Sequence, residues 1–90
     1  SHLMRRLNRS ASEELHAAIQ QELTGSECVD CADALCRSMA AVCAVGADDF
    51  PKALAALEAM FKVSGYYLAR SFDTIKAEST NAYLSADKVQ

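Results

Sequence analysis

Apolar residues recur along the chain at the three- and four-residue spacing of amphipathic helices, in three segments separated by short turns. The first segment predicts a helix over about residues 11 to 24. Ser10 and Glu13 have the spacing of a capping box, and Gly25 is placed to end the helix in a left-handed conformation. The apolar residues of this segment are Leu15, Ala18, Ile19 and Leu23.

The second segment predicts a helix over about residues 27 to 45. Ser26 can cap its first turn, and Gly46 marks its end. Asp33 and Arg37 stand four residues apart on its polar side, a spacing that favours an ion pair. The central apolar stripe consists of Cys28, Ala32, Leu35, Met39 and Val42, of which the last three are predicted core or dimer-seam residues.

The third segment carries the strongest pattern in the chain and predicts a helix over about residues 51 to 77. Asp49 can cap this helix, and Pro51 suits its first turn because the missing N–H has no helical partner there. Gly65 falls on the main apolar stripe, where it would let another backbone approach closely. This stripe, a predicted core or dimer seam, consists of Leu54, Leu57, Phe61, Gly65, Leu68, Phe72 and Ile75.

A second apolar stripe lies about 80 to 100° further around the same helix. It consists of Ala56, Met60, Val63 and Tyr67. A helix that is apolar on two adjacent faces packs on two sides. Either the first helix covers the second stripe within one closed bundle, or another polypeptide covers it. On the second alternative, the predicted partner-binding residues are Met60, Val63, Tyr66 and Tyr67.

Length and composition favour an all-α fold. The chain has 90 residues, is 51% hydrophobic, and contains only three Gly and one Pro, which gives few turn signals for a many-stranded fold. We predict a short N-terminal helix followed by an antiparallel two-helix hairpin, completed as a helical bundle by dimerisation. Residues 1–9 are expected to be a vector remnant and a basic flexible arm, 10–77 a single helical domain, and 78–90 a frayed or separately docked tail.

Charge argues against a nucleic-acid-binding surface. The chain has nine Lys and Arg against twelve Asp and Glu, and three of the nine form the basic arm Arg5, Arg6 and Arg9. The remaining acidic excess is unsuited to general phosphate binding, so no direct nucleic-acid contact is expected. Neither a signal peptide nor an apolar run of about 18 residues is present, which predicts a cytoplasmic protein without a membrane segment.

The four cysteines include a C-x-x-C motif, Cys28 and Cys31. A zinc site needs two further ligands, but Cys36 and Cys43 lie too far along the same helix to converge with the motif. His16 offers one geometrically conceivable third ligand. A thioredoxin-like redox motif would follow a strand, and none is predicted. We therefore expect four reduced cysteines that act as small buried hydrophobes, with no metal or cofactor; a Cys-based metal or thiol sensor is a lesser alternative.

Catalytic motifs are missing from the sequence. It contains no G-x-S-x-G, no glycine-rich phosphate loop and no H-E-x-x-H, and its paired carboxylates stand at predicted helix starts, where capping explains them. The chain is therefore predicted not to be an enzyme.

Residues 26 to 76, rich in Ala, Cys and Leu and carrying ALAALEAMFKVSGYYL on the second of two helices, resemble the small all-helical quorum-sensing antiactivators of the QslA kind. The resemblance covers about half of the chain and rests on size and helical pattern. It implies a cytoplasmic dimer that binds a LuxR-type transcription factor and blocks its dimerisation or DNA binding, without catalysis or cofactor. The expected function is sequestration of a protein partner through an apolar helix surface. The alternative is a helical chaperone or a structural subunit of a larger complex.

Overall fold

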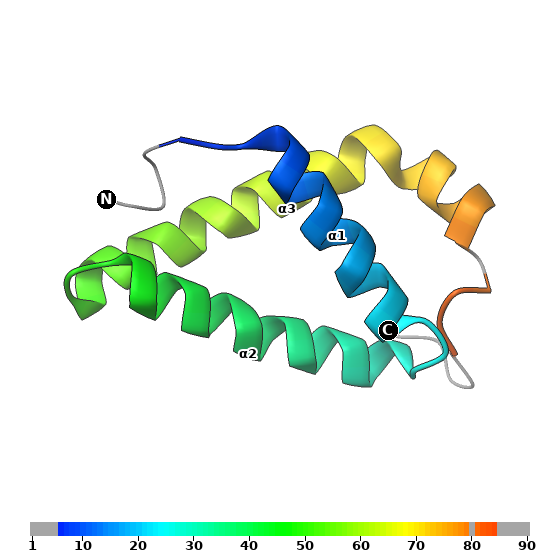
Figure 1. Cartoon of the computed structure of the whole chain (residues 1–90), viewed down its shortest axis with the longest axis horizontal. Helices are drawn as coiled ribbons and strands as arrows, with labels where there is room; N and C mark the ends of the chain where they lie inside the picture. Colours follow the sequence, from blue (N-terminus) through cyan, green and yellow to red (C-terminus); the bar gives the residue numbers. More distant parts are fainter. Residues whose placement is uncertain (1–5, 80, 85–90) are drawn as a thin grey trace.

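The computed structural model describes residues 6–79 and 81–84. In this part of the chain the regular elements are α1 (Arg9–Leu23), α2 (Cys28–Gly46) and α3 (Phe50–Ser79), shown in Figure 1. The expected all-α class is confirmed. Every predicted helix end lies within two residues of the observed one, which is the usual uncertainty of a helix boundary.

The start of α1 differs from the prediction. Asn8, not Ser10, is the N-cap, because its side-chain oxygen accepts a hydrogen bond of 3.0 Å from the backbone N–H of Ala11. Asn caps a helix about as well as Ser does, and this position adds residues to the helix. Ser10 lies inside α1, as does Arg9 of the expected basic arm.

The cap predicted for α2 is also wrong, because the helix start is completed by a distant segment. Glu27 is the N-cap, with no side-chain hydrogen bond, and the backbone N–H of Cys28 donates to Leu84 O at 2.8 Å. Two further backbone bonds fix this segment on the α1–α2 turn: Leu84 N–H to Ser26 O at 2.9 Å, and Gly25 N–H to Ala82 O at 2.8 Å. Gly25 has φ +88°, which confirms the predicted left-handed conformation.

Of the expected C-terminal tail, residues 78 and 79 belong to α3 and residues 81–84 are docked, whereas 80 and 85–90 lie outside the described residues. A side-chain bond supports the docking, since Gln20 Nε2–H donates to Tyr83 Oη at 2.6 Å. This segment connects the end of α3 to the turn between α1 and α2, and it supplies backbone partners that the turn cannot supply itself.

The start of α3 agrees with the prediction. Asp49 Oδ1 accepts a hydrogen bond of 3.0 Å from the backbone N–H of Lys52, and Pro51 stands in the first turn. The helix then continues without interruption through Ser64 and Gly65 for 30 residues. At 1.5 Å per residue this is roughly 45 Å, considerably longer than α2.

The contact between α2 and α3 is the main packing contact of the chain. The two helices run in opposite directions and lie next to each other near the turn that joins them, and they diverge away from this turn (Figure 1). Cys43 of α2 is 2% exposed, and its Sγ lies 3.2 Å from Sδ of the half-buried Met60 of α3. Ala53 and Ala56 are half-buried on the same side of α3. Small and polarizable side chains let the two backbones approach closely.

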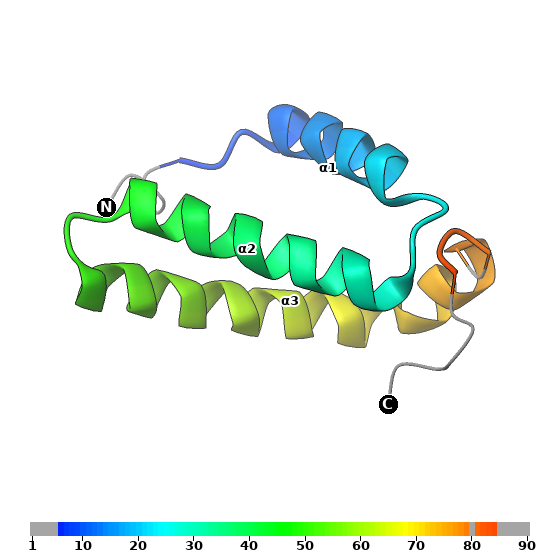
Figure 2. The ribbon, with the colours of Figure 1, turned by 90° about the horizontal axis from the view of Figure 1, so that it is seen from below.

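Helix α1 lies across this pair as a separate layer, as the view in Figure 2 shows. It contacts α2 near the turn, where the buried thiol of Cys31 donates to Leu23 O at 3.6 Å. At its other end α1 stands apart from α3, with a cavity between the two helices. The three helices therefore do not close around a common core.

The open arrangement leaves much surface in contact with water. The chain exposes 7733 Å², about 1.5 times the roughly 5,100 Å² expected for a folded monomer of its mass. Its Cα radius of gyration is 14.4 Å, against roughly 12 Å for a compact domain of this length. Among the described hydrophobic residues only Cys31 and Cys43 are fully buried. No helix in the described part is long and apolar enough to cross a lipid bilayer.

The α2–α3 contact predicts a difference between two cysteine substitutions on α2. Cys43→Ser places a hydroxyl in an apolar contact and should lower the free energy of unfolding by about 1 to 3 kcal/mol. Cys36→Ser is the matched control, because Cys36 is exposed and should change the value by less than about 0.5 kcal/mol. Urea unfolding followed by circular dichroism, at one protein concentration, measures both. Equal effects of the two substitutions would contradict this account of the contact.

Candidate interaction surfaces

Helix α3 uses the side with its smaller residues to contact α2. The second apolar stripe predicted from the sequence faces α2 at Ala56 and Met60, so α2 covers this part of the stripe, not α1. Met60 was predicted to bind a partner, and it contacts Cys43 inside the chain. Only part of its side chain is left for a partner to contact.

The main stripe of α3 is largely exposed, and Ile75 near its C-terminal end also lines the cavity between α1 and α3. We call its residues Leu54, Phe61, Gly65, Leu68, Phe72 and Ile75 the outer stripe. Phe61 is 75% exposed and Leu68 is 55% exposed, whereas the neighbouring Leu57 is half-buried. A Cβ atom built on Gly65 would have no neighbour within 4 Å. The outer stripe therefore does not form the core of a single chain. Of the two roles predicted for it, core or dimer seam, the dimer seam stays a prediction.

The predicted core stripe of α2 is only partly covered. Leu35 is 37% exposed and Val42 48%, and Met39 is half-buried. The residues that α2 buries fully are Cys31 and Cys43, because their small side chains lie at the closest approaches to the neighbouring helices.

The cysteines differ in burial. Cys28 is half-buried and Cys36 is exposed, so the expectation that all four would be buried is wrong for Cys36. All four have free thiols. In the described residues no group of three or more His, Cys, Asp or Glu side chains is arranged to hold a metal ion. His16 does not join the C-x-x-C motif; it lines the cavity between α1 and α3.

An exposed cluster, here called the aromatic patch, consists of Val63, Tyr66, Tyr67 and Arg70. The rings of Tyr66 and Tyr67 have centroids 6.5 Å apart and planes inclined by 57°. The guanidinium carbon of Arg70 lies 5.4 Å from the centroid of the Tyr66 ring, and Nη1–H donates to Tyr66 Oη at 3.3 Å. The structure thus brings three of the four predicted partner-binding residues together on an exposed face.

Arg70 was not among the predicted partner-binding residues. Its spacing of four residues from Tyr66 on a helix was the signal in the sequence that could have identified it. Tyr and Arg are the residue types most enriched among the energetically dominant positions of protein interfaces. Arg70 contacts the Tyr66 ring through its own side chain, so it belongs to the same exposed cluster.

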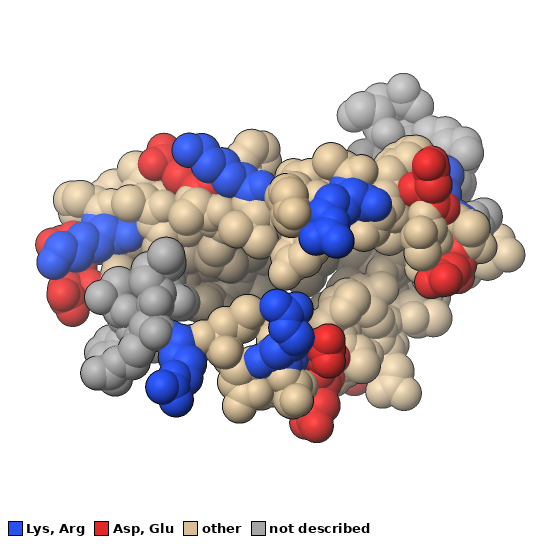
Figure 3. Space-filling model, turned by 90° about the horizontal axis from the view of Figure 1, so that it is seen from above, with Lys and Arg blue, Asp and Glu red and all other residues tan. Residues whose placement is uncertain are grey.

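Charged side chains are mixed in sign. In Figure 3, Lys and Arg alternate with Asp and Glu along α3 and beside the N-terminal part of α1. Arg37 pairs with Asp33 at 2.9 Å, as their spacing predicted, and Lys52 pairs with Asp48 at 3.5 Å. Both pairs are exposed and of small energetic value. The face in Figure 3 has no continuous basic stripe of the kind that follows a nucleic-acid backbone.

No protein family model, no curated protein and no solved structure matches this chain.

Proposed function

We propose that this chain is a non-enzymatic regulatory protein that works as a cytoplasmic homodimer and sequesters a protein partner through apolar helix surfaces. The observation that carries the proposal is the exposure of two separate apolar faces of α3. One is the outer stripe, and the other is the aromatic patch. Soluble monomers rarely expose large apolar side chains in a row along one face of a helix, as the outer stripe does.

The outer stripe suits contact with a second copy of the chain. Its large apolar side chains flank Gly65, where nothing prevents a second backbone from approaching closely. Two α2–α3 hairpins joined along their outer stripes would form a helical bundle.

The aromatic patch suits a different protein. At 100° per residue, Tyr66 and Tyr67 lie roughly 120 to 140° around α3 from Phe61, so a dimer joined at the outer stripe would leave them free. The resemblance to antiactivators of the QslA kind points to a LuxR-type transcription factor as the partner. Binding would cover the regulator's own association surface and prevent its dimerisation or DNA binding.

The homodimer predicts distinct effects of three substitutions in the outer stripe. Leu68→Asp should make the protein monomeric while its helical circular dichroism is retained, since Leu68 is exposed in the single chain. Gly65→Leu should weaken self-association about tenfold or more by overpacking the seam, and Gly65→Ala should weaken it less. In the single chain a Cβ atom at Gly65 meets nothing within 4 Å, so weaker self-association of the variants would be attributed to contact between chains.

Light scattering over a range of protein concentrations measures these effects. A monomeric mass for the unmodified protein at high concentration would contradict the dimer. Identical masses for all variants would show that the outer stripe is not its seam.

The partner proposal is tested at Tyr66, which belongs to the aromatic patch and does not line the cavity. The tagged protein, purified from its native cells, should bring down a LuxR-type regulator identified by mass spectrometry. Tyr66→Ala should reduce this capture about 30-fold, as removal of a dominant aromatic contact does. Lys52→Ala is the control, because Lys52 is exposed near the other end of α3.

With the regulator purified, the unmodified protein should abolish its DNA-bound band in a gel-shift assay. Recovery of an unfolded client or of a larger complex in place of a regulator would favour the chaperone or structural-subunit alternative and contradict the antiactivator role.

A further inference from the structure

Helix α1 faces α3 with polar side chains. Its apolar residues Leu15 and Ile19 are 64% and 42% exposed. The side that faces α3 carries Arg9, Ser12 and His16, at the spacing of one helical face. A helix that only covered a core would turn its apolar residues inward. The orientation of α1 therefore calls for an explanation other than core packing.

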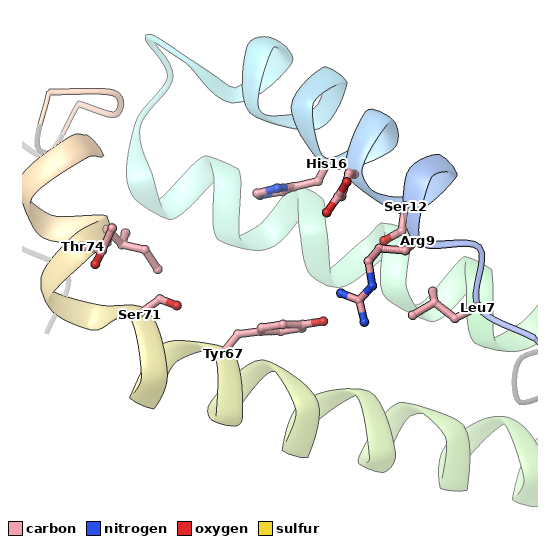
Figure 4. Close-up of a pocket in the computed structure, with 9 residues that line it drawn as sticks. Leu7, Arg9, Ser12, His16, Tyr67, Ser71 and Thr74 are labelled. Atoms are coloured by element: carbon pink, nitrogen blue, oxygen red, sulfur yellow. The ribbon is translucent and has the colours of Figure 1, made fainter.

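Between α1 and α3 lies a cavity of about 640 Å³, within the size range of small-molecule sites. Figure 4 shows Arg9, Ser12 and His16 projecting from α1 toward α3, with the ring of Tyr67 beneath Arg9. Ser71 and Thr74 stand on the α3 side. Two segments that are far apart in the sequence thus place cationic and hydroxyl groups around one space.

The polar side chains that line the cavity do not stabilise the fold through hydrogen bonds or ion pairs with other described side chains. In the described part of the chain, the side chains of Arg9, Ser12, His16, Ser71 and Thr74 make no hydrogen bond or ion pair with one another or with other described side chains. Arg9 has five N–H donors in a planar fork that matches a carboxylate. Leu7, Ile75 and the face of the Tyr67 ring add apolar surface to the same walls.

We propose that this cavity binds a small amphipathic carboxylate, a property beyond the proposed function. Its walls share Tyr67 with the aromatic patch and Ile75 with the outer stripe. The carboxylate lies between Arg9 and the Tyr67 hydroxyl, within reach of Ser12, and the apolar body lies against Leu7 and Ile75. Glu13 also lines the cavity and repels such a ligand. Removing the charge of Glu13 therefore tests the charge of the ligand, because it would strengthen binding of an anion and weaken binding of a cation.

The test uses octanoate as the probe, titrated into the ¹⁵N-labelled full chain and followed by NMR. Saturable shifts should concentrate at residues 9–16 and 67–75. Acetate, which lacks the apolar body, and octanamide, which lacks the charge, should bind at least about tenfold more weakly. Shifts centred on Leu54, Phe61 and Gly65, the part of the outer stripe away from the cavity, would indicate general adsorption to apolar surface and overturn the proposal. Equal affinity for octanamide, or no binding, would also overturn it.

Variants on both walls localise the site. Arg9→Gln should weaken octanoate binding about tenfold, and Arg6→Gln, the neighbouring control outside the cavity lining, should not. Glu13→Gln should tighten binding several-fold through loss of repulsion. Ser71→Leu should weaken octanoate binding by narrowing the cavity from the α3 side. Unchanged affinity in Arg9→Gln, or weaker binding in Glu13→Gln, would overturn the assignment.

Dimer mass and partner capture are measured separately from octanoate binding. A failure of the octanoate experiment therefore leaves the proposed function standing.

Discussion

The structure depends on one close helix–helix contact, in which the buried Cys43 of α2 lies against Met60 of α3. Small residues on both helices allow this approach, but they bury little apolar area per residue. The larger apolar side chains of α3, including Phe61 and Leu68, remain in water. A single chain of 90 residues thus leaves its strongest hydrophobic pattern unpaired. In the proposed homodimer, a second copy of the chain would cover it.

This constraint gives each side of α3 a different role. The side with Ala53 and Met60 holds α2, the outer stripe is open to a second copy, and the aromatic patch is open to a different protein. A rigid long helix can serve several contacts at once because its faces are fixed relative to one another. The docked segment 81–84 completes the α1–α2 turn and so determines where α1 lies, and with it the cavity beside α3.

Local signals in the sequence were enough to predict the helices, since hydrophobic spacing and the Asp49 cap depend only on nearby residues. Periodicity identifies apolar stripes on a helix without saying which neighbour each one meets. The stripe of large residues was therefore predicted to be either core or dimer seam, whereas α2 packs beside the smaller Ala56. The cap of α2 depends on Leu84, which is distant in sequence, and no local rule could supply it. The aromatic patch was largely predictable, and the cavity was not, because it depends on how α1 is placed.

The central claim is that the fold is completed between chains, and the most direct measurement is the dependence of unfolding on protein concentration. A fold that gains stability by association unfolds at a higher urea concentration as the protein concentration is raised. The account predicts that the urea midpoint rises steadily over a hundredfold range of protein concentration. A midpoint that stays constant over this range would show that the single chain is stable by itself and would contradict the account.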